Sequence, residues 1–240
     1  MTGIKRPEAA MILAAGLGTR MRPLTNDRPK VLVSLNGLAL IDHTLERLYE
    51  VGVGRIVVNV HHHAEMLASH LAQQNKTEIR VSDESTELLE TGGGIAQALP
   101  LLDRECFYVV NGDVVWLDGV VNTLDRLANR WDAAEMDALL LVELCPRAVG
   151  YAGVGDFMMD GCGLLRRRQE REVAPYVYAG VQILHRRLFE SCPTGAFSLN
   201  LLYDRAIEAG RLFGLCHDGL WLHVGSPDGL RAAEVALHEL

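Results

Sequence analysis

The sequence predicts an α/β fold with a Rossmann-like, doubly wound and mostly parallel sheet, followed by a small antiparallel lobe. Short β-rich runs alternate with amphipathic helical stretches up to about residue 145, which is the pattern of a parallel sheet with helices on both faces. After Pro146 the pattern changes to β-rich segments that are interrupted by glycine. A chain of 240 residues, 49% of them hydrophobic, is long enough to bury one large core.

The parallel part of the sheet is predicted from five β-rich runs. These runs are residues 10–13, 55–60, 78–82, 107–110 and 137–142. Apolar residues share one helical face in the segments between them, at residues 40–50, 64–73 and 119–130. Ligands of such a sheet bind at the carboxyl ends of the strands, where Gly16, Gly112 and Asp113 fall.

The antiparallel lobe is predicted from residues 151–158, 163–168 and 175–184. Two more helices are expected at residues 199–209 and 226–240, the second with Ser226 as N-cap and Pro227 at its first position. The sequence contains no linker and no internal repeat. We therefore expect residues 1–240 to form a single domain.

Charge and composition argue against several classes of partner. The net charge is −8, and the arginines at 166–168 and 171 are a local exception to the lack of a basic patch, so nucleic acid is not an expected partner. The apolar runs are far shorter than the roughly 20 residues of a membrane span, and the N-terminus lacks the apolar region of a signal peptide. The five cysteines are far apart, which indicates reduced packing residues. We expect a cytoplasmic protein without a membrane partner.

A glycine loop follows the first predicted strand. The strand ends at Ala14 and Ala15 and continues into Gly-Leu-Gly-Thr-Arg at residues 16–20. Such a loop can point backbone N–H groups and a guanidinium at phosphate oxygens, although a plain structural turn explains two glycines equally well. It is not a Walker loop, and the Rossmann G-x-G-x-x-G pattern fails because residue 21 is Met.

The surrounding residues extend this motif. Residues 13–25 are Leu-Ala-Ala-Gly-Leu-Gly-Thr-Arg-Met-Arg-Pro-Leu-Thr, and Arg-Pro-Lys follows at residues 28–30. This segment resembles the signature of sugar-1-phosphate nucleotidyltransferases, and the resemblance covers nearly the whole chain. Within that family it is most similar to the N-acetylmuramate α-1-phosphate uridylyltransferases, with the mannose-1-phosphate guanylyltransferases close behind.

The resemblance implies a reaction and a division of the chain. A nucleotidyl group would pass from a nucleoside triphosphate, UTP in the first instance, to a sugar 1-phosphate such as N-acetylmuramic acid α-1-phosphate, with release of pyrophosphate. In the cell this reaction would belong to the recycling of cell-wall sugars. Residues up to about 145 would bind the nucleotide, and residues from about 146 to 240 would bind the sugar and form the closing helix.

The resemblance also assigns roles to the residues of the loop. The nucleotide-binding residues are Ala14, Ala15, Gly16, Gly18, Thr19 and Arg20. Lys30 would lie against the α-phosphate, where a fixed ammonium stabilises the negative charge that attack at phosphorus concentrates on the non-bridging oxygens. The implied catalytic residues are Arg20, Lys30 and Asp113. From the residues alone, a solvated surface lysine is the alternative for Lys30.

A second glycine segment is Glu-Thr-Gly-Gly-Gly at residues 90–94, before an apolar helical stretch. The resemblance implies that Glu90, Thr91 and Gly93 bind the base and ribose, and glycines would permit close backbone approach. A helix-entry turn explains the same residues almost as well. Glu84 stands upstream, where relatives often have a carboxylate, and is assigned only weakly.

The triplet Asn111-Gly112-Asp113 ends an apolar predicted strand. Asp113 is the predicted metal ligand, because Mg²⁺ prefers hard oxygen donors and usually takes one or two carboxylates plus nucleotide phosphates. A turn or capping Asp is the alternative. The resemblance assigns Asn111 to both the nucleotide and the sugar.

Near the C-terminus, Trp-Leu-His-Val-Gly-Ser-Pro at residues 221–227 matches the closing motif of the family except at His223. The family usually has Asp there as a second metal ligand. A neutral nitrogen donor suits Mn²⁺, Co²⁺ or Zn²⁺ better than Mg²⁺. The expected cofactor is therefore Mg²⁺, with Mn²⁺ or another divalent ion as the alternative.

The resemblance assigns Tyr178 and Gly180 to the sugar pocket, while the residues alone indicate a core strand. Relatives commonly have a phosphate-contacting Lys upstream, and residues 165–171 contain only arginines as basic residues. One arginine of 166–168 could replace it, although runs of charge are usually solvated faces. The three histidines at 61–63 are predicted to be a strand-end loop, because consecutive side chains of an extended segment point in alternating directions.

Other functions remain open at this point. A non-catalytic sugar-nucleotide-binding regulatory protein could keep the fold, and His223 is the feature that supports it. A cytidylyltransferase for a phospho-alcohol would share the loop. The sequence shows no Ser-His-Asp or Cys-His constellation, and nucleotidyl transfer needs none because a sugar phosphate is already anionic. Without a long C-terminal extension we expect a monomer or homodimer.

Overall fold

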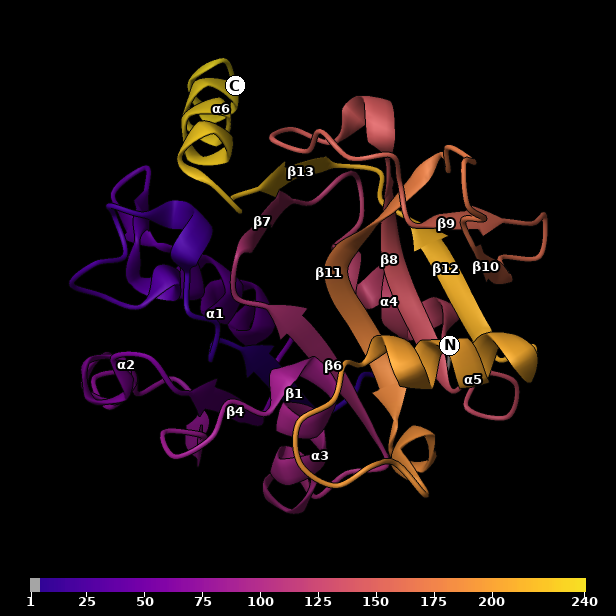
Figure 1. Ribbon diagram of the computed structural model, residues 1–240, viewed down its shortest axis with the longest axis horizontal. Helices are drawn as coiled ribbons and strands as arrows, with labels where there is room; N and C mark the ends of the chain where they lie inside the picture. The colour runs from indigo at the N-terminus through magenta and orange to yellow at the C-terminus, as the bar shows by residue number, and fades with distance from the viewer. Residues whose placement is uncertain (1–4) are drawn as a thin grey trace.

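The fold is built around a nine-stranded mixed sheet, which the computed structural model describes with its helices over residues 5–240 (Figure 1). One half of the sheet is parallel, in the order β5-β4-β1-β6. Its strands are β1 (Ala9–Leu13), β4 (Arg55–Val60), β5 (Glu78–Asp83) and β6 (Cys106–Asn111). Because β1, β4 and β6 are parallel neighbours, their carboxyl ends lie at the same edge of the sheet and open into one crevice.

The other half of the sheet is mixed. The long strand β11 (Tyr176–His185) runs antiparallel between β6 and β8 (Ala138–Leu144), and β12 (Leu212–Cys216) lies parallel to β8. The short antiparallel strands β9 (Phe157–Met159) and β10 (Leu165–Arg167) extend the sheet at the Tyr176 end. Antiparallel strands are thus present as predicted. Residues 175–184, however, lie mainly in the centre of the sheet and not in a small lobe, because β11 is almost wholly buried.

The predicted strand at residues 151–158 is largely wrong, since only Phe157–Met159 is a strand. Gly155 has a positive φ of 77°, a conformation that glycine adopts readily. Its N–H donates a hydrogen bond to Tyr151 Oη at 3.2 Å. This contact closes the segment into a loop before β9 begins.

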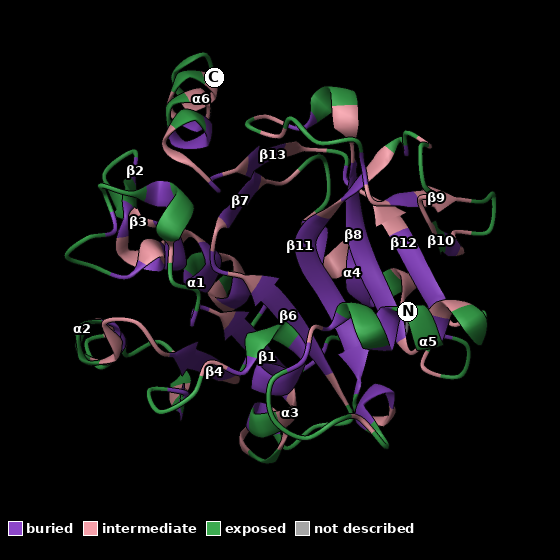
Figure 2. Ribbon diagram, viewed as in Figure 1, coloured by how far each residue is buried: buried purple, intermediate pink, exposed green. Residues whose placement is uncertain are grey.

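Helices cover both faces of the sheet, as predicted for a doubly wound fold. On one face lie α1 (Leu40–Glu50), α2 (Ala64–Leu71) and α4 (Thr123–Arg130); on the other lie α3 (Glu90–Leu102) and α5 (Asn200–Glu208). Figure 2 shows the buried strands between helices whose outer surfaces are exposed. Along β1, Ile12 packs toward α1 and Met11 toward α3, because successive side chains of a strand point to opposite faces.

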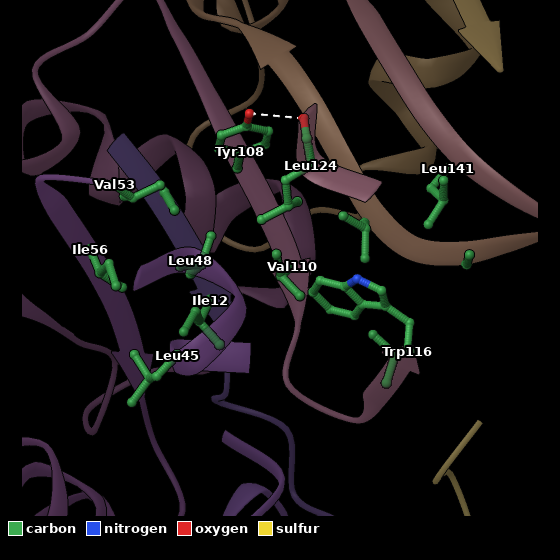
Figure 3. Packing of buried hydrophobic residues seen from close by; sticks show 14 of the residues in the cluster. Ile12, Leu45, Leu48, Val53, Ile56, Tyr108, Val110, Trp116, Leu124 and Leu141 are labelled. Atoms are coloured by element: carbon green, nitrogen blue, oxygen red, sulfur yellow. Dashed lines mark hydrogen bonds between the residues drawn. The ribbon is translucent and has the colours of Figure 1, made fainter. Parts of the chain in front are cut away.

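The core beneath α1 and α4 includes one polar anchor (Figure 3). Ile12, Leu45 and Leu48 pack together there. The buried Tyr108 donates its hydroxyl hydrogen to the Leu124 carbonyl at 3.1 Å. A buried hydroxyl needs such a partner, and the hydrogen bond ties β6 to α4.

Two short strands that the sequence analysis did not predict, β7 (Val114–Leu117) and β13 (Leu220–His223), form an antiparallel pair. Val114 pairs with His223. The pair therefore brings the C-terminal motif beside Asp113, although the two segments lie more than a hundred residues apart in the chain. A second small pair is β2 (Ser34–Leu35) with β3 (Leu38–Ala39).

Helix boundaries follow the caps. The helix predicted at 119–130 begins only at Thr123, because Asn122 Oδ1 accepts hydrogen bonds from the N–H groups of Leu124 and Asp125. The helix α6 (Pro227–His238) has the predicted cap, in which Ser226 Oγ accepts from Gly229 N–H at 3.1 Å.

The structure bears on the expectations for membrane spans and cysteines. No helix within residues 5–240 is long and apolar enough to cross a membrane. The expectation that the N-terminus lacks a signal peptide falls partly on residues 1–4, which lie outside the described residues. All five cysteines are free, and Cys162 is exposed and not a packing residue.

Candidate active site

A cavity of about 440 Å³ opens at the carboxyl ends of β1, β4 and β6, where the sequence predicted a ligand. The glycine loop forms one wall, and the segment before and at the start of α3 forms another. The predicted site residues in its lining are Ala14, Ala15, Gly16, Gly18, Thr19, Arg20, Lys30, Glu90, Thr91, Asn111 and Asp113. Asn59, Leu88 and Gly225 also line it.

The backbone conformation of the glycine loop depends on Gly18. Its φ of 63° is in the left-handed region, and its carbonyl accepts a hydrogen bond from Thr25 Oγ1 at 2.8 Å. A Cβ at this position would lie 3.1 Å from Thr25 and 3.2 Å from Lys30. At Gly16, in contrast, a Cβ would meet nothing within 4 Å, so the loop leaves open space on its cavity side.

These two glycines give a matched pair of substitutions. Gly18→Ala should lower the free energy of unfolding by about 1–2 kcal/mol, the usual penalty of a left-handed conformation for a residue with a Cβ. Gly16→Ala should change it by less than about 1 kcal/mol. Urea unfolding followed by circular dichroism measures both values, and equal losses would contradict the conformational explanation.

Lys30 and Asp113 form an ion pair inside the cavity. Lys30 Nζ lies 2.7 Å from Asp113 Oδ2, and the two side chains are 11% and 25% exposed. Gly112 makes this arrangement possible, because a Cβ there would lie 2.5 Å from Val31 and 3.0 Å from the Leu13 carbonyl. Burial opposes ionisation of Asp113, yet the Lys30 ammonium, with smaller contributions from His223 and Arg20, lowers the pKa of this carboxyl below its usual value.

His223 lies beside this pair. The Val224 N–H donates to the Asp113 carbonyl at 3.1 Å. The His223 ring stacks on Trp221 at 5.7 Å and meets the Tyr151 ring edge-on at 6.3 Å. Burial lowers the pKa of His223, so the imidazole is neutral at pH 7. Its Nε2 lies against Gly225, which leaves no room for a side chain there.

The residues at this position could hold a divalent ion. Lys30 occupies one oxygen of Asp113, and the second oxygen is left for an ion. Within residues 5–240, no three His, Cys, Asp or Glu side chains gather in a way that could hold a metal by themselves. One carboxylate completed by substrate phosphates and water is the usual arrangement for Mg²⁺.

The glycine triplet at residues 92–94 packs against protein and not toward the cavity. A Cβ would lie 2.3 Å from the Phe197 ring at Gly92, 2.3 Å from the Gly195 carbonyl at Gly93, and 2.6 Å from Glu84 Oε1 at Gly94. The close backbone approach that these glycines permit is therefore between α3 and its neighbours. Gly93, predicted to contact the nucleotide, lies behind Glu90 and Thr91.

Gly180 lies beside Asn111, and neither Tyr178 nor Gly180 lines the cavity. Gly180 has a φ of 77°, and a Cβ there would lie 2.8 Å from Val114 and 3.3 Å from Asn111 Cβ. The Tyr178 N–H donates to Asp156 Oδ2 at 2.9 Å, and burial raises the pKa of the Tyr178 hydroxyl. The pairing of β11 with β8 is irregular between Tyr178 and Gln182, the stretch that includes Gly180.

The arginine run makes contacts on the protein surface. Arg166 pairs with Glu172 at 2.9 Å, and Arg167 pairs with Asp204 at 2.7 Å. Arg168 donates to the main-chain carbonyl of Glu172 at 2.9 Å. Each of the three guanidinium groups therefore has a partner within the protein.

The histidines at 61–63 lie between β4 and α2. His61 Nδ1 is hydrogen-bonded to the Glu84 carbonyl at 2.7 Å. The rings of His62 and His63 are 4.0 Å apart. The segment lies in the connection after β4, where the sequence analysis placed it.

Asn59 is a polar lining residue that the sequence analysis missed. Its Oδ1 accepts from Ala14 N–H at 2.7 Å, and its Nδ2 donates to Glu84 Oε1 at 2.7 Å. The available signal was one polar residue within the apolar strand Arg55–Val60. A polar residue in such a strand needs a buried partner, but the sequence does not identify that partner.

Comparison with known proteins places this cavity in context. A family model described as "Nucleotidyl transferase" matches residues 9–154. An N-acetylmuramate alpha-1-phosphate uridylyltransferase of Caulobacter vibrioides is 44% identical over 97% of this chain and 98% of its own length. A protein of the same name from Neisseria meningitidis serogroup B is 34% identical over 94% of this chain and 96% of its own length.

More distant proteins share the fold. A probable mannose-1-phosphate guanylyltransferase of rice is 28% identical over 91% of this chain and 61% of its own length. The crystal structure of HddC from Yersinia pseudotuberculosis, with GMP-PN, matches with a TM-score of 0.76 at 22% identity, over 95% of this chain and 99% of that one. A putative glucose-1-phosphate thymidylyltransferase from Bacillus anthracis matches with a TM-score of 0.79 at 16% identity, over 97% and 96%. These structures confirm the predicted fold class.

Proposed function

Because the chain belongs to the Nucleotidyl transferase family of sugar-1-phosphate nucleotidyltransferases, we propose that it transfers the uridylyl group of UTP to N-acetylmuramate α-1-phosphate. The family predicted from the sequence is thus confirmed. The observation that carries the proposal is that one cavity joins the glycine loop to the Lys30–Asp113 pair. Two N-acetylmuramate alpha-1-phosphate uridylyltransferases are 44% and 34% identical to this chain, which supports the choice of base and sugar.

The reaction requires no general base. A phosphate oxygen of the sugar 1-phosphate attacks the α-phosphorus of UTP, the bond between Pα and the bridging oxygen to Pβ breaks, and pyrophosphate leaves with the bonding electrons. The nucleophile is already anionic, so no proton must move. Alignment of the two substrates is then the principal requirement.

Each part of the cavity has a proposed role in that alignment. The glycine loop and Arg20 hold the β- and γ-phosphates. Lys30 Nζ stabilises the charge on the α-phosphate oxygens, and Asp113 holds Lys30 in place through the 2.7 Å contact. Glu90, Thr91 and Asn111 face the nucleoside. Asn111, which lies next to Gly180, would also contact the sugar together with Tyr178 and Gly180.

The proposed cofactor is a divalent ion. Asp113 would hold it through the carboxylate oxygen that Lys30 leaves free, with His223 as a second, weaker ligand. Such an ion would neutralise phosphate charge and help to orient the triphosphate. Because His223 offers nitrogen where oxygen suits Mg²⁺ better, we propose that Mn²⁺ supports the reaction at least as well as Mg²⁺.

His223→Asp tests this metal assignment. The substitution should increase Mg²⁺-supported turnover relative to Mn²⁺-supported turnover several-fold, because it replaces an imidazole nitrogen by a carboxylate oxygen, which Mg²⁺ prefers. Pyrophosphate release with each ion, measured for both proteins, gives the ratio. An unchanged ratio would mean that His223 does not contact the ion.

The chain also divides by role in this proposal. Residues up to about 145 supply the nucleotide side, and residues from about 146 onward supply the sugar side and the closing helix. The lining of the cavity supports the division, because within residues 5–240 Gly225 is the one lining residue that follows Asp113. The strand β11, which runs through the centre of the sheet, joins the two parts.

A substrate matrix tests the proposed function. The purified protein is incubated with UTP, GTP or CTP against N-acetylmuramate α-1-phosphate, mannose 1-phosphate or phosphocholine, with Mg²⁺ and with Mn²⁺, and pyrophosphate is measured. We expect the highest rate with UTP and N-acetylmuramate α-1-phosphate. A preference for GTP with mannose 1-phosphate, or for CTP with phosphocholine, would replace the substrates proposed here, and no turnover with any pair would favour a regulatory protein.

A further inference from the structure

Three buried hydrogen bonds connect two walls of the cavity. The Ala14 N–H donates to Asn59 Oδ1 at 2.7 Å, Asn59 Nδ2 donates to Glu84 Oε1 at 2.7 Å, and the Leu89 N–H donates to Glu84 Oε2 at 3.0 Å. Asn59 is 2% exposed and Glu84 is 1% exposed. A buried carboxylate is unfavourable unless its oxygens are hydrogen-bonded, and both oxygens of Glu84 have a partner.

An amide at residue 59 and a carboxylate at residue 84 are the side chains that these hydrogen bonds require. The Ala14 N–H needs an acceptor and the Glu84 carboxylate needs a donor, so an amide with its oxygen toward Ala14 satisfies both. Glu84 faces two donors, which a carboxylate can accept and an amide cannot. The space for the carboxylate exists because residue 94 is glycine, where a Cβ would lie 2.6 Å from Glu84 Oε1 and 3.0 Å from Asn59 Nδ2.

Both ends of this connection lie at the cavity. Ala14 begins the glycine loop, and Leu89 directly precedes Glu90 and Thr91, which line the opposite wall. Glu90 has a φ of 58°, a conformation that a residue with a side chain keeps only where its surroundings hold it. The hydrogen bond to the Leu89 N–H fixes the main chain immediately before this residue.

We propose that Asn59 and Glu84 are positioning residues that hold the glycine loop and the wall at residues 88–91 at the separation that a nucleoside triphosphate requires. A cleft that is already ordered binds its ligand more tightly, because less conformational freedom is lost on binding. This inference rests on the proposed function, since it assigns the cavity to the triphosphate. It is specific to the nucleotide, since both connected walls precede the sugar side of the chain.

Single substitutions test the connection through nucleotide affinity. In Glu84→Gln the new NH₂ group faces either Asn59 Nδ2 or the Leu89 N–H, both of which are donors. One hydrogen bond is therefore lost, and the Kd for UTP, measured by calorimetry, and the KM for UTP should each rise at least about tenfold. The KM for the sugar phosphate should stay within about twofold. Glu87→Gln, a matched loss of one carboxylate at an exposed position nearby, should leave all three constants unchanged.

The double substitution Asn59→Asp with Glu84→Gln tests the pairing itself. The new carboxylate can accept from the Ala14 N–H and from the new amide, whose oxygen can accept from the Leu89 N–H, so all three hydrogen bonds can form again with the same total charge. Asn59→Asp alone places two carboxylates face to face. The double variant should therefore bind UTP at least about tenfold more tightly than Asn59→Asp alone, and its Tm should be higher.

The possible results separate this inference from the proposed function. If the unsubstituted protein binds UTP and Glu84→Gln binds it equally well, the inference is overturned and the function stands. A double variant no better than Asn59→Asp would overturn it also, and that comparison remains informative if Glu84→Gln does not fold. If the KM values of both substrates rise equally, and in proportion to the decrease in Tm among the variants, the two residues have a general structural role instead. If the unsubstituted protein binds no nucleoside triphosphate, both proposals are wrong.

Discussion

Lys30→Ala is expected to lower kcat/KM by about 100- to 1,000-fold, the usual cost of removing one group that stabilises developing negative charge. Lys30 is the partner of Asp113 and lines the cavity at the start of the short helix Lys30–Leu32. Its side chain is only 11% exposed, so water competes weakly for its charge. Loss of the side chain removes a preorganised charge without removing a core residue.

The matched control for this substitution is Lys76→Ala. Lys76 forms an ion pair with Glu46, and both side chains are about half exposed, so its removal should leave turnover unchanged. Both variants are assayed by pyrophosphate release. If Lys30→Ala kept turnover within about threefold of the unsubstituted protein, where a lost transition-state contact costs far more, the proposed role of Lys30 would be wrong.

The same substitution has a pH-dependent effect on stability. Lys30 lowers the pKa of Asp113 in the folded protein, so the pair stabilises the fold above the unfolded pKa of about 3.9 and loses this effect as pH falls below it. The difference in Tm between Lys30→Ala and the unsubstituted protein should be largest at neutral pH. It should become smaller as pH falls below about 4 toward the lowered pKa of Asp113, which thermal unfolding at several pH values can measure.

Asp113→Asn is expected to lower turnover at least about 100-fold, because metal-assisted charge stabilisation contributes several kcal/mol and each 1.4 kcal/mol is a factor of ten. The change keeps the size of the side chain and an oxygen that can accept from Lys30. It removes the charge that would hold the divalent ion. The fold should therefore persist while catalysis is lost.

Metal binding distinguishes this variant from Lys30→Ala. Binding of Mn²⁺ in the presence of UTP, followed by electron paramagnetic resonance, should weaken in Asp113→Asn and persist in Lys30→Ala. Asp228→Asn, at a side chain 87% exposed and paired with Arg231, provides the matched control. Unchanged Mn²⁺ binding in Asp113→Asn would exclude Asp113 as the ligand.

Several elements could be predicted from the sequence because their signals are local. The helix Leu40–Glu50 and the strand Arg55–Val60 have the bounds that were expected, since their apolar residues follow the helix and strand periods within one short segment. The Ser226 cap was predicted for the same reason. Lys30 and Asp113 were identified through a motif, and the structure places them 2.7 Å apart.

Other features depend on contacts between distant segments. The central position of β11 (Tyr176–His185) arises from its pairing with β6 and β8, and the strands Val114–Leu117 and Leu220–His223 are stabilised by each other. Neither shows a strong local signal. For the same reason the neighbours of the glycines at 92–94, which are Phe197, Gly195 and Glu84, could not be predicted from the sequence.

The sequence by itself therefore determined the α/β class, the glycine loop and the residues that carry charge in the cavity, because each of these depends on neighbours in the chain. The tertiary structure alone decided that His223 lies beside Asp113 and that Asn59 and Glu84 join the two walls of the cavity. Apart from the contact between Glu84 and Leu89, each of those contacts joins residues that are far apart in the chain. Sheet pairing brings them together, and buried polar groups then require the partners that they find there.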